Sequence, residues 1–392
     1  MFLKPSYGRS MTNNEATTQH VGELRPFRID VDQADLDDLA DRLARTRLPR
    51  PAPGDDGTYG ITNAYLSDAL DHWRTRFDWR AVERRANAYD QVLTEVDGQP
   101  IHLLHVRSAE PDATPLLLVH SYPGSFLDFL DLIDPLVDPV AHGGRAEDAF
   151  HVVIPSLPGF AFSTPVVEKG WTSRRVATTL DALMRALGYD AYGVHGSDLG
   201  ALVARELGRV RPEGFLGLHV LQLFSFPSGD AEEMAQLGPD DVAGLEHLQW
   251  FQSVGGYNAM NASRPQTVAV GLSDSPVGLL AYDELFMSFG NGTSKVEIDQ
   301  VLAQVTLQWL TNTASSVVRY HYEDARADDD GSRNDARTGV AVFADDFRTI
   351  KAFAQRDNGN VAHWSHHRSG GHYAAMEVPD VLAADLRTFF AG

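Results

Sequence analysis

The chain has 392 residues and carries 33 Lys and Arg against 54 Asp and Glu, so its formal net charge is −21. A field of that sign repels phosphate backbones and anionic lipid surfaces, which argues against nucleic-acid and membrane partners. The absence of cysteine excludes disulfides, a thiol nucleophile and thiolate–zinc sites.

The N-terminal part of the chain divides into a tail and an extension. We expect residues 1–22 to be a flexible tail, because the stretch is largely polar and shows no periodicity. We predict that residues 23–114 form an N-terminal extension with alternating and helical patterns. Its predicted elements are a strand at 27–31, helices at 36–43 and 62–90, and a strand at 99–108 after the Asp97–Gly98 turn.

Residues 115–224 contain continuous apolar runs that alternate with helical segments. The runs read "TPLLLV", "FHVVIP", "AYGVHG" and "EGFLGLHVLQL". Apolar strands without alternation are buried on both faces, as in a parallel sheet. The pattern therefore predicts an α/β fold with a mostly parallel central sheet and helices on both faces.

The pattern changes over residues 225–325, which are helical and aromatic without a clear buried strand. It returns over 326–392, with strands at 338–346 and 361–372 and a last helix at 379–390. A helical insertion between sheet strands is the usual form of a cap over an active site. We therefore predict a core interrupted by a helical cap.

No window of about 18 consecutive apolar residues occurs, so no membrane span is expected. The N-terminal residues also lack the apolar centre of a signal peptide. Together with the missing cysteines, these features predict a cytoplasmic protein.

The stretch "GVHGSDLGA" (193–201) lies at the end of an apolar strand and leads into a helix. A sharp strand-to-helix turn that exposes a nucleophile needs small residues two positions to either side of it. Asp198 is flanked in this way by Gly196 and Gly200, whereas Ser197 is flanked by a histidine and a leucine. The pattern favours Asp198 as the nucleophile, and an ordinary turn with a capping Ser or Asp is the alternative.

Partners for Asp198 follow later strands in the order that such a site requires, which is nucleophile, acid and histidine. Asp345 and Asp346 come directly after an apolar strand, and His372 lies in a Gly-rich loop after the last one. An oxyanion hole would use the backbone N–H of Leu199 and that of Tyr122 in the loop "VHSYPGSF".

These features resemble the epoxide hydrolases of the microsomal type over nearly the whole chain after about residue 24. The motifs stand in the order of that family: "PFRIDV", "DLDDLADRLARTRLP", "HWRTRFDWRAVERRAN", "DGQPIHLLHVRS", "HSYPGSFLDF", "SLPGFAFS", "HGSDLG", "LSDSPVGLLAY" and "GGHYAAMEVPDVLAADLRTFF". The resemblance implies an α/β-hydrolase fold with an inserted helical cap and an N-terminal extension that wraps the core. The missing membrane anchor makes the chain similar to soluble bacterial members.

The resemblance also implies roles for individual residues. Asp198 matches the nucleophile, His372 the general base and Asp346 the orienting acid, with Asp345 as the alternative. Tyr257 matches the first cap tyrosine, which donates a hydrogen bond to the epoxide oxygen.

Three positions depart from the family pattern. The second cap tyrosine aligns with His321, and a shift by one residue would bring Tyr320 or Tyr322 to that place. Ser121 stands in the oxyanion loop where the family usually has glycine, and Leu199 stands where many relatives have an aromatic residue.

The implied reaction converts an epoxide and water to a vicinal diol through a covalent aspartyl ester, without metal or organic cofactor. The sequence features also allow a haloalkane dehalogenase and a non-catalytic binding protein with this fold. The dehalogenase is disfavoured because Leu199 is not the tryptophan that commonly binds the halide. Roles in natural-product biosynthesis and in detoxification, and assembly into a homodimer, are all left open.

Histidines near the C-terminus raise the question of a metal site. His366 and His367 are adjacent and therefore point to opposite faces of a strand, so they do not converge with His363. We expect structural or exposed histidines here and no bound metal.

Overall fold

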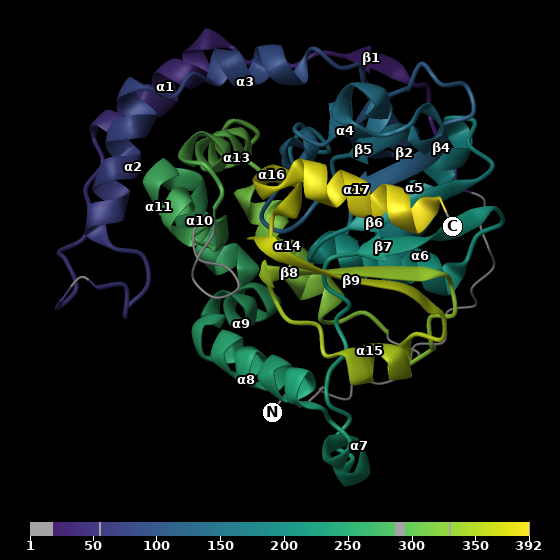
Figure 1. Cartoon of the computed structure of the whole chain (residues 1–392). Coiled ribbons are helices and arrows are strands. Elements are labelled where there is room, and N and C mark those ends of the chain that lie inside the picture. Colours follow the sequence, from purple (N-terminus) through teal and green to yellow (C-terminus); the bar gives the residue numbers. More distant parts are fainter. Residues whose placement is uncertain (1–18, 55, 287–294, 329–330, 392) are drawn as a thin grey trace.

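The computed structural model describes residues 19–54, 56–286, 295–328 and 331–391. Within these ranges, nine strands form one sheet in the order β1-β2-β3-β5-β4-β6-β7-β8-β9 (Figure 1). The strands are β1 (Arg25–Phe27), β2 (Gln91–Val96), β3 (Gln99–Val106), β4 (Thr114–Val119), β5 (Phe150–Pro155), β6 (Tyr192–Gly196), β7 (Phe215–Val220), β8 (Thr338–Asp345) and β9 (Val361–Gly371).

Strands β4 to β9 pair in parallel, and β1, β2, β3 and β5 pair antiparallel at one side. The central parallel strands are buried along most of their length because helices cover both faces. The sequence prediction of a mostly parallel α/β sheet is therefore confirmed.

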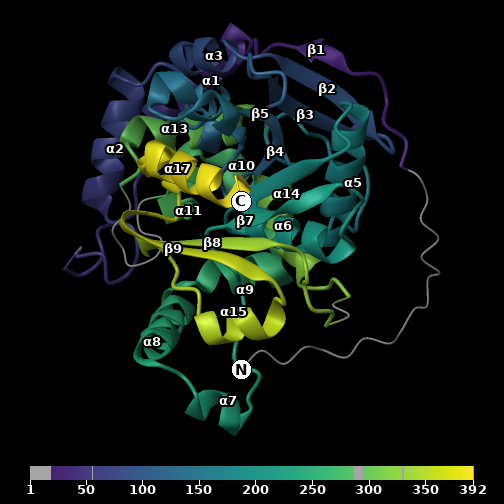
Figure 2. The ribbon, with the colours of Figure 1, turned by 45° about the vertical axis from the view of Figure 1, so that its right-hand side comes forward.

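The two faces of the sheet carry different helices. One face packs against α5 (Ser173–Ala186), α6 (Leu199–Val210) and α15 (Lys351–Asp357), and the other against α4 (Ile133–Val137) and α17 (Pro379–Phe390). Figures 1 and 2 show α17 on one side of β9 and α15 on the other. The short elements α16 (Ala374–Glu377), η1 (Phe126–Phe129), η2 (Pro139–His142) and η3 (Ala146–Asp148) complete the core.

Helices from two distant parts of the chain share a third hydrophobic cluster. The N-terminal helices α1 and α2 contact α11, and α3 contacts α13, so the N-terminal helices lie against the inserted helices (Figure 1). The N-terminal helices are α1 (Gln33–Ala44), α2 (Asn63–Thr75) and α3 (Trp79–Ala86). The inserted helices are α7 (Ala231–Ala235), α8 (Pro239–Val254), α9 (Gly256–Ser263), α10 (Pro265–Asp274), α11 (Pro276–Tyr282), α13 (Ile298–Leu310) and α14 (Ala314–Asp324).

Several predicted elements near the N-terminus need correction. The predicted helix over 62–90 is two helices, because Asp78 caps α3 by accepting from the amide of Arg80 at 2.9 Å. The predicted strand over 27–31 ends at Phe27, since the amide of Ile29 donates to the side chain of Asn87 instead of to a strand.

Strand β2 (91–96) was not predicted, and it pairs with residues of the expected tail. Residues 1–18 of that tail lie outside the described residues, whereas Val21 forms a bridge with Val96. Among the described residues, no helix is both long enough and apolar enough to cross a membrane.

Candidate active site

Asp198 occupies the sharp turn between β6 and α6 with backbone angles of φ 49° and ψ −115°. A side chain at Gly196 would place its Cβ 2.2 Å from the carbonyl oxygen of Gly200. A Cβ at Gly200 would lie 2.0 Å from the carbonyl oxygen of Val119. Both positions therefore require glycine, and the turn holds Asp198 in a conformation that residues with side chains rarely adopt.

The carboxylate of Asp198 lies between the oxyanion loop and His372. Its Oδ1 accepts a hydrogen bond from the amide of Tyr122 at 3.1 Å, and its Oδ2 lies 3.8 Å from Nε2 of His372. The side chain of Asp198 is 19% exposed, so a substrate can reach it. Leu199 is the first residue of α6, where a backbone N–H has no acceptor within its own helix.

His372 and Asp346 form a buried hydrogen-bonded pair. Nδ1 of His372 donates to Oδ1 of Asp346 at 2.9 Å. Burial alone would lower the pKa of His372, but the carboxylates of Asp346 and Asp198 outweigh it and raise the pKa above its usual value. Asp345 instead pairs with Lys295 at 3.1 Å, so the geometry favours Asp346 as the partner of His372.

Gln222 is a site residue that the sequence analysis missed. Its Oε1 accepts from the amide of Asp198 at 2.5 Å, while its Nε2 donates to Oδ2 of Asp346 and lies 3.2 Å from Nδ1 of His372. The side chain is fully buried just after β7. The sequence feature that could have revealed Gln222 is its position inside the apolar run "HVLQL", because a buried polar side chain needs a hydrogen-bonding partner.

The oxyanion loop is held by the buried carboxylate of Asp128. This carboxylate accepts from the amide and hydroxyl of Ser121 at 3.1 and 2.8 Å, from the amide of Ser125 at 3.4 Å and from Nε2 of Gln304 at 2.7 Å. Burial raises the pKa of Asp128 to about 6, although the hydrogen bonds from the two serines act in the opposite direction. Ser121, which departs from the family pattern, thus provides one of the bonds that position the loop.

Two side chains from the inserted helices lie over the oxyanion loop. The ring of Tyr257 on α9 stacks on that of Tyr122 at 5.8 Å, and His321 on α14 meets the same ring edge-on at 4.4 Å. Burial, followed by the charge of Asp198, raises the pKa of Tyr257 well above its usual value. Burial lowers the pKa of His321 to about 4, so its ring is neutral at pH 7.

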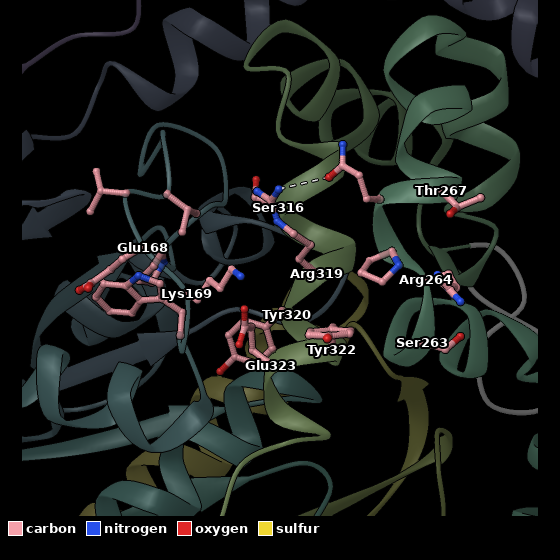
Figure 3. Close-up of a pocket in the computed structure, with 16 residues that line it drawn as sticks. Glu168, Lys169, Ser263, Arg264, Thr267, Ser316, Arg319, Tyr320, Tyr322 and Glu323 are labelled. Atoms are coloured by element: carbon pink, nitrogen blue, oxygen red, sulfur yellow. Dashed lines mark hydrogen bonds between the residues drawn. The ribbon is translucent and has the colours of Figure 1, made fainter. Parts of the chain in front are cut away.

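The neighbours of His321 face a different region. The hydroxyl of Tyr320 lies 3.0 Å from Oγ of Ser173, and the ring of Tyr322 packs under the guanidinium of Arg326 at 3.5 Å. Figure 3 shows both tyrosines along a separate pocket beside Arg319 and Glu323. Of the three candidates for the second donor, the structure brings only His321 against Tyr122 and Tyr257.

Tyr257 also lines a cavity of about 750 Å³. The cavity lies between the N-terminal segment 56–65 and helices α8 and α9, and its wall includes Tyr59, Trp250 and Phe251. Its wall also includes polar residues such as Thr58 and Glu284, and Tyr257 is the proposed site residue that lines it.

Comparisons with known proteins agree with this geometry. The family described as "Epoxide hydrolase N terminus" matches residues 24–129, and that described as "alpha/beta hydrolase fold" matches residues 114–253. A protein of Stigmatella aurantiaca named "Putative epoxide hydrolase" is 40% identical over 376 aligned residues, and the match covers 94% of this chain and 84% of that protein. Epoxide hydrolase 1 of Sus scrofa is 30% identical over 400 residues, covering 93% and 88% of the two chains.

Solved structures show the same likeness. The epoxide hydrolase of Aspergillus niger superposes with a TM-score of 0.82 at 28% identity, covering 94% of this chain and 96% of that one. The juvenile hormone epoxide hydrolase of the silkworm Bombyx mori superposes with a TM-score of 0.85 at 25% identity, covering 94% of each chain. The chain has the α/β-hydrolase fold and belongs to the epoxide hydrolase family.

Proposed function

We propose that the protein hydrolyses an epoxide to a vicinal diol through a covalent ester on Asp198. The observation that carries this proposal is the position of one carboxylate between two functional groups. The amide of Tyr122 binds Oδ1 of Asp198, and the histidine of a buried His372–Asp346 pair lies 3.8 Å from Oδ2. A nucleophile, an oxyanion donor and a general base thus meet at one point.

In the first step, a carboxylate oxygen of Asp198 attacks an epoxide carbon and the ring C–O bond breaks. Negative charge develops on the released oxygen, which Tyr257 and His321 neutralise by donating hydrogen bonds and a proton. His321 is suited to this task because its neutral ring retains one N–H donor at pH 7. The product is an alkyl ester of Asp198 that carries a free hydroxyl.

In the second step, His372 takes a proton from water, and the resulting hydroxide attacks the carbonyl carbon of the ester. Asp346 stabilises the imidazolium that forms. The N–H groups of Tyr122 and Leu199 bind the oxyanion of the tetrahedral intermediate. The C–O bond to the substrate then breaks, the leaving alkoxide takes the proton from His372, and the diol departs. Asp198 retains an oxygen from water, and its carboxylic acid proton returns to the donor that was deprotonated in the first step.

Aspartate suits this reaction better than the neighbouring Ser197. A carboxylate can displace at the saturated electrophilic carbon of an epoxide without prior deprotonation. Its product is an ester, which water can cleave, whereas a serine would form an ether that it could not release.

We further propose that the substrate is a bulky epoxide, of the kind met in natural-product biosynthesis and in detoxification. The support is the cavity of about 750 Å³, whose wall includes Tyr257 and further aromatic side chains together with polar residues. A panel of small aryl epoxides and polycyclic epoxides tests this point through kcat/KM. Higher kcat/KM for styrene-type epoxides than for polycyclic ones would contradict it.

A single turnover in ¹⁸O-labelled water tests the mechanism itself. Attack by Asp198 predicts that the first diol contains only unlabelled oxygen and that the label enters the Asp198 carboxylate, detectable by mass spectrometry of the peptide. Label in the first diol would show direct attack by water and would overturn the covalent mechanism.

A further inference from the structure

Histidines on successive strands form a row on the face of the sheet that α17 covers. The register pairs His195 with His219, His219 with Gly339 and Gly339 with His363, so these residues lie side by side across β6 to β9. Directly paired residues of neighbouring strands point to the same face. Gly339 adds no side chain to the row. A Cβ at this position would lie 2.8 Å from the ring of Phe389.

Two histidines of the row, together with His367, converge on one carboxylate, that of Asp385 on α17. Nε2 of His219 lies 2.8 Å from Oδ2 of Asp385, and Nε2 of His363 lies 3.1 Å from Oδ1. His367 shares the face of His363 because it lies four residues further along β9, and its Nε2 is 3.2 Å from Oδ1. These four residues are called the His–Asp cluster below.

We propose that the His–Asp cluster binds one zinc-type divalent cation, with His219, His363 and Asp385 as its protein ligands and His367 as an outer partner of Asp385. Imidazole nitrogen and carboxylate oxygen are donors that Zn²⁺ prefers. Bonds of about 2.0–2.1 Å would hold neighbouring ligand atoms about 3.4 Å apart. The N–O separations from Asp385, 2.8 Å to His219 and 3.1 Å to His363, are somewhat shorter than that spacing, and ligand atoms of these three residues all lie within 4.8 Å of one another.

The surroundings of the cluster fit a bound cation. A histidine that ligates a metal usually donates its other ring N–H to a neighbouring group. Nδ1 of His219 lies 2.9 Å from Nδ1 of His195, which can accept such a bond deep in the core. The side chain of Asp385 is only 5% exposed, so a divalent ion would also neutralise a largely buried charge.

The cluster is separate from the catalytic residues. His219 precedes Gln222 by three residues, a distance of about 10 Å along a strand. His367 precedes His372 by five residues on the chain. A cation in the cluster would therefore tie the edge strand β9 to β7 and α17, and we assign it a structural role.

This proposal departs from the expectation that no metal binds. The expectation rested on His366 and His367, which do point to opposite faces of β9. The exposed His366 accepts from the indole N–H of Trp364, on the face away from Asp385. The missing information was that His219 and Asp385, which are far away in the sequence, complete the set.

The test uses the full-length chain, free of any histidine tag and treated with a chelator, titrated with ZnCl₂. Isothermal titration is expected to show one saturable site per chain, with a rise in the unfolding midpoint. His363→Ala and His367→Ala should each weaken the affinity by more than about 10-fold, because even an outer partner of a ligand contributes about 10- to 100-fold. Both side chains are partly exposed, at 20% and 19%, so the variants should fold.

The matched control is His366→Ala, which removes an exposed histidine from the other face of the same strand and should leave the affinity unchanged. Co²⁺ gives a second readout, because a tetrahedral site with nitrogen and oxygen ligands produces strong visible absorption. Absence of a saturable 1:1 site would overturn the proposal. Equal affinity in the His363→Ala, His367→Ala and His366→Ala variants would likewise overturn it, by showing that zinc binds elsewhere.

Discussion

Gln222 connects the backbone of Asp198 to Asp346, the carboxylate that is hydrogen-bonded to His372. Its Oε1 accepts from the Asp198 amide at 2.5 Å, and its Nε2 donates to Asp346. One buried side chain thus holds both the strained turn and the His372–Asp346 pair. The side-chain amide of Gln222 carries no charge. It therefore donates a hydrogen bond to Asp346 without competing for the proton of His372.

Gln222→Ala should lower kcat by about 10- to 100-fold, because each buried partner left unsatisfied costs about 1–3 kcal/mol. Gln222→Glu should also raise the pKa on the acidic limb of the pH–rate profile, since a second carboxylate beside His372 favours its protonated form. Steady-state kinetics over pH measure both effects. An acidic limb that stays in place in Gln222→Glu would show that Gln222 only fills space.

His372→Gln should allow the first step and block the second. We expect one alkyl ester per chain to accumulate on the Asp198 peptide, while diol formation falls by about 10³-fold or more. Mass spectrometry after mixing with substrate detects the adduct. His366→Gln, on the exposed side of β9, is the control and should turn over normally. A variant that forms neither ester nor diol would argue against His372 acting only as the base.

The pH dependence of kcat should report His372. The ring must be neutral to accept a proton, so kcat should rise with pH through the raised pKa of this residue. Asp346→Asn removes the charge that raises this pKa, and should therefore move the acidic limb to lower pH and reduce the plateau. Asp345→Asn breaks a partly exposed ion pair with Lys295 and should leave the limb in place. If the acidic limb moved in Asp345→Asn and stayed in place in Asp346→Asn, Asp345 would be the partner of His372.

The same pKa shift has a consequence for stability. Because the pKa of His372 is higher in the folded than in the unfolded state, its contribution is fully present below the unfolded value of about 6.5. That contribution is lost as the pH rises through the folded pKa. In Asp346→Asn, this part of the pH dependence of the free energy of unfolding should disappear.

His321→Phe should slow ester formation by about 10²-fold, since general-acid assistance contributes about 10²- to 10⁴-fold and Tyr257 would remain. His321→Tyr should preserve most of the rate by restoring a donor. Tyr322→Phe is the control, because that ring faces Arg326 outside the site. Pre-steady-state mixing measures the ester-forming step. A loss of rate in Tyr322→Phe that exceeds the loss in His321→Phe would contradict the assignment.

Asp128→Ala should both destabilise the protein and lower kcat. It leaves buried donors of Ser121, Ser125 and Gln304 without their acceptor, at about 1–3 kcal/mol for each one that stays unsatisfied. Ser121→Ala removes only the hydroxyl bond and should cost about 1 kcal/mol. Urea unfolding combined with kinetics compares the two variants. Equal losses in both would mean that the carboxylate does not hold the loop.

The sequence was most informative where local sterics leave few choices. Gly196 and Gly200 can be recognised without a structure, because the turn around Asp198 excludes any side chain two positions away. The apolar runs predicted the parallel strands for a similar reason, since a strand buried on both faces has no place for alternating polar residues. The ordered motifs then indicated the family, which the relatives confirm.

The tertiary structure decided the matters that depend on contacts between distant segments. The family resemblance favoured Asp346 but left Asp345 as the alternative, and the packing of β8 against β9 shows that the carboxylate of Asp346 lies against His372. The choice of His321 over its neighbouring tyrosines depends on the rotation of α14 over the oxyanion loop, which spacing alone does not set. Gln222 and the His–Asp cluster remained hidden for the same reason: a buried polar side chain becomes interpretable only when its partners, brought together by folding, are known.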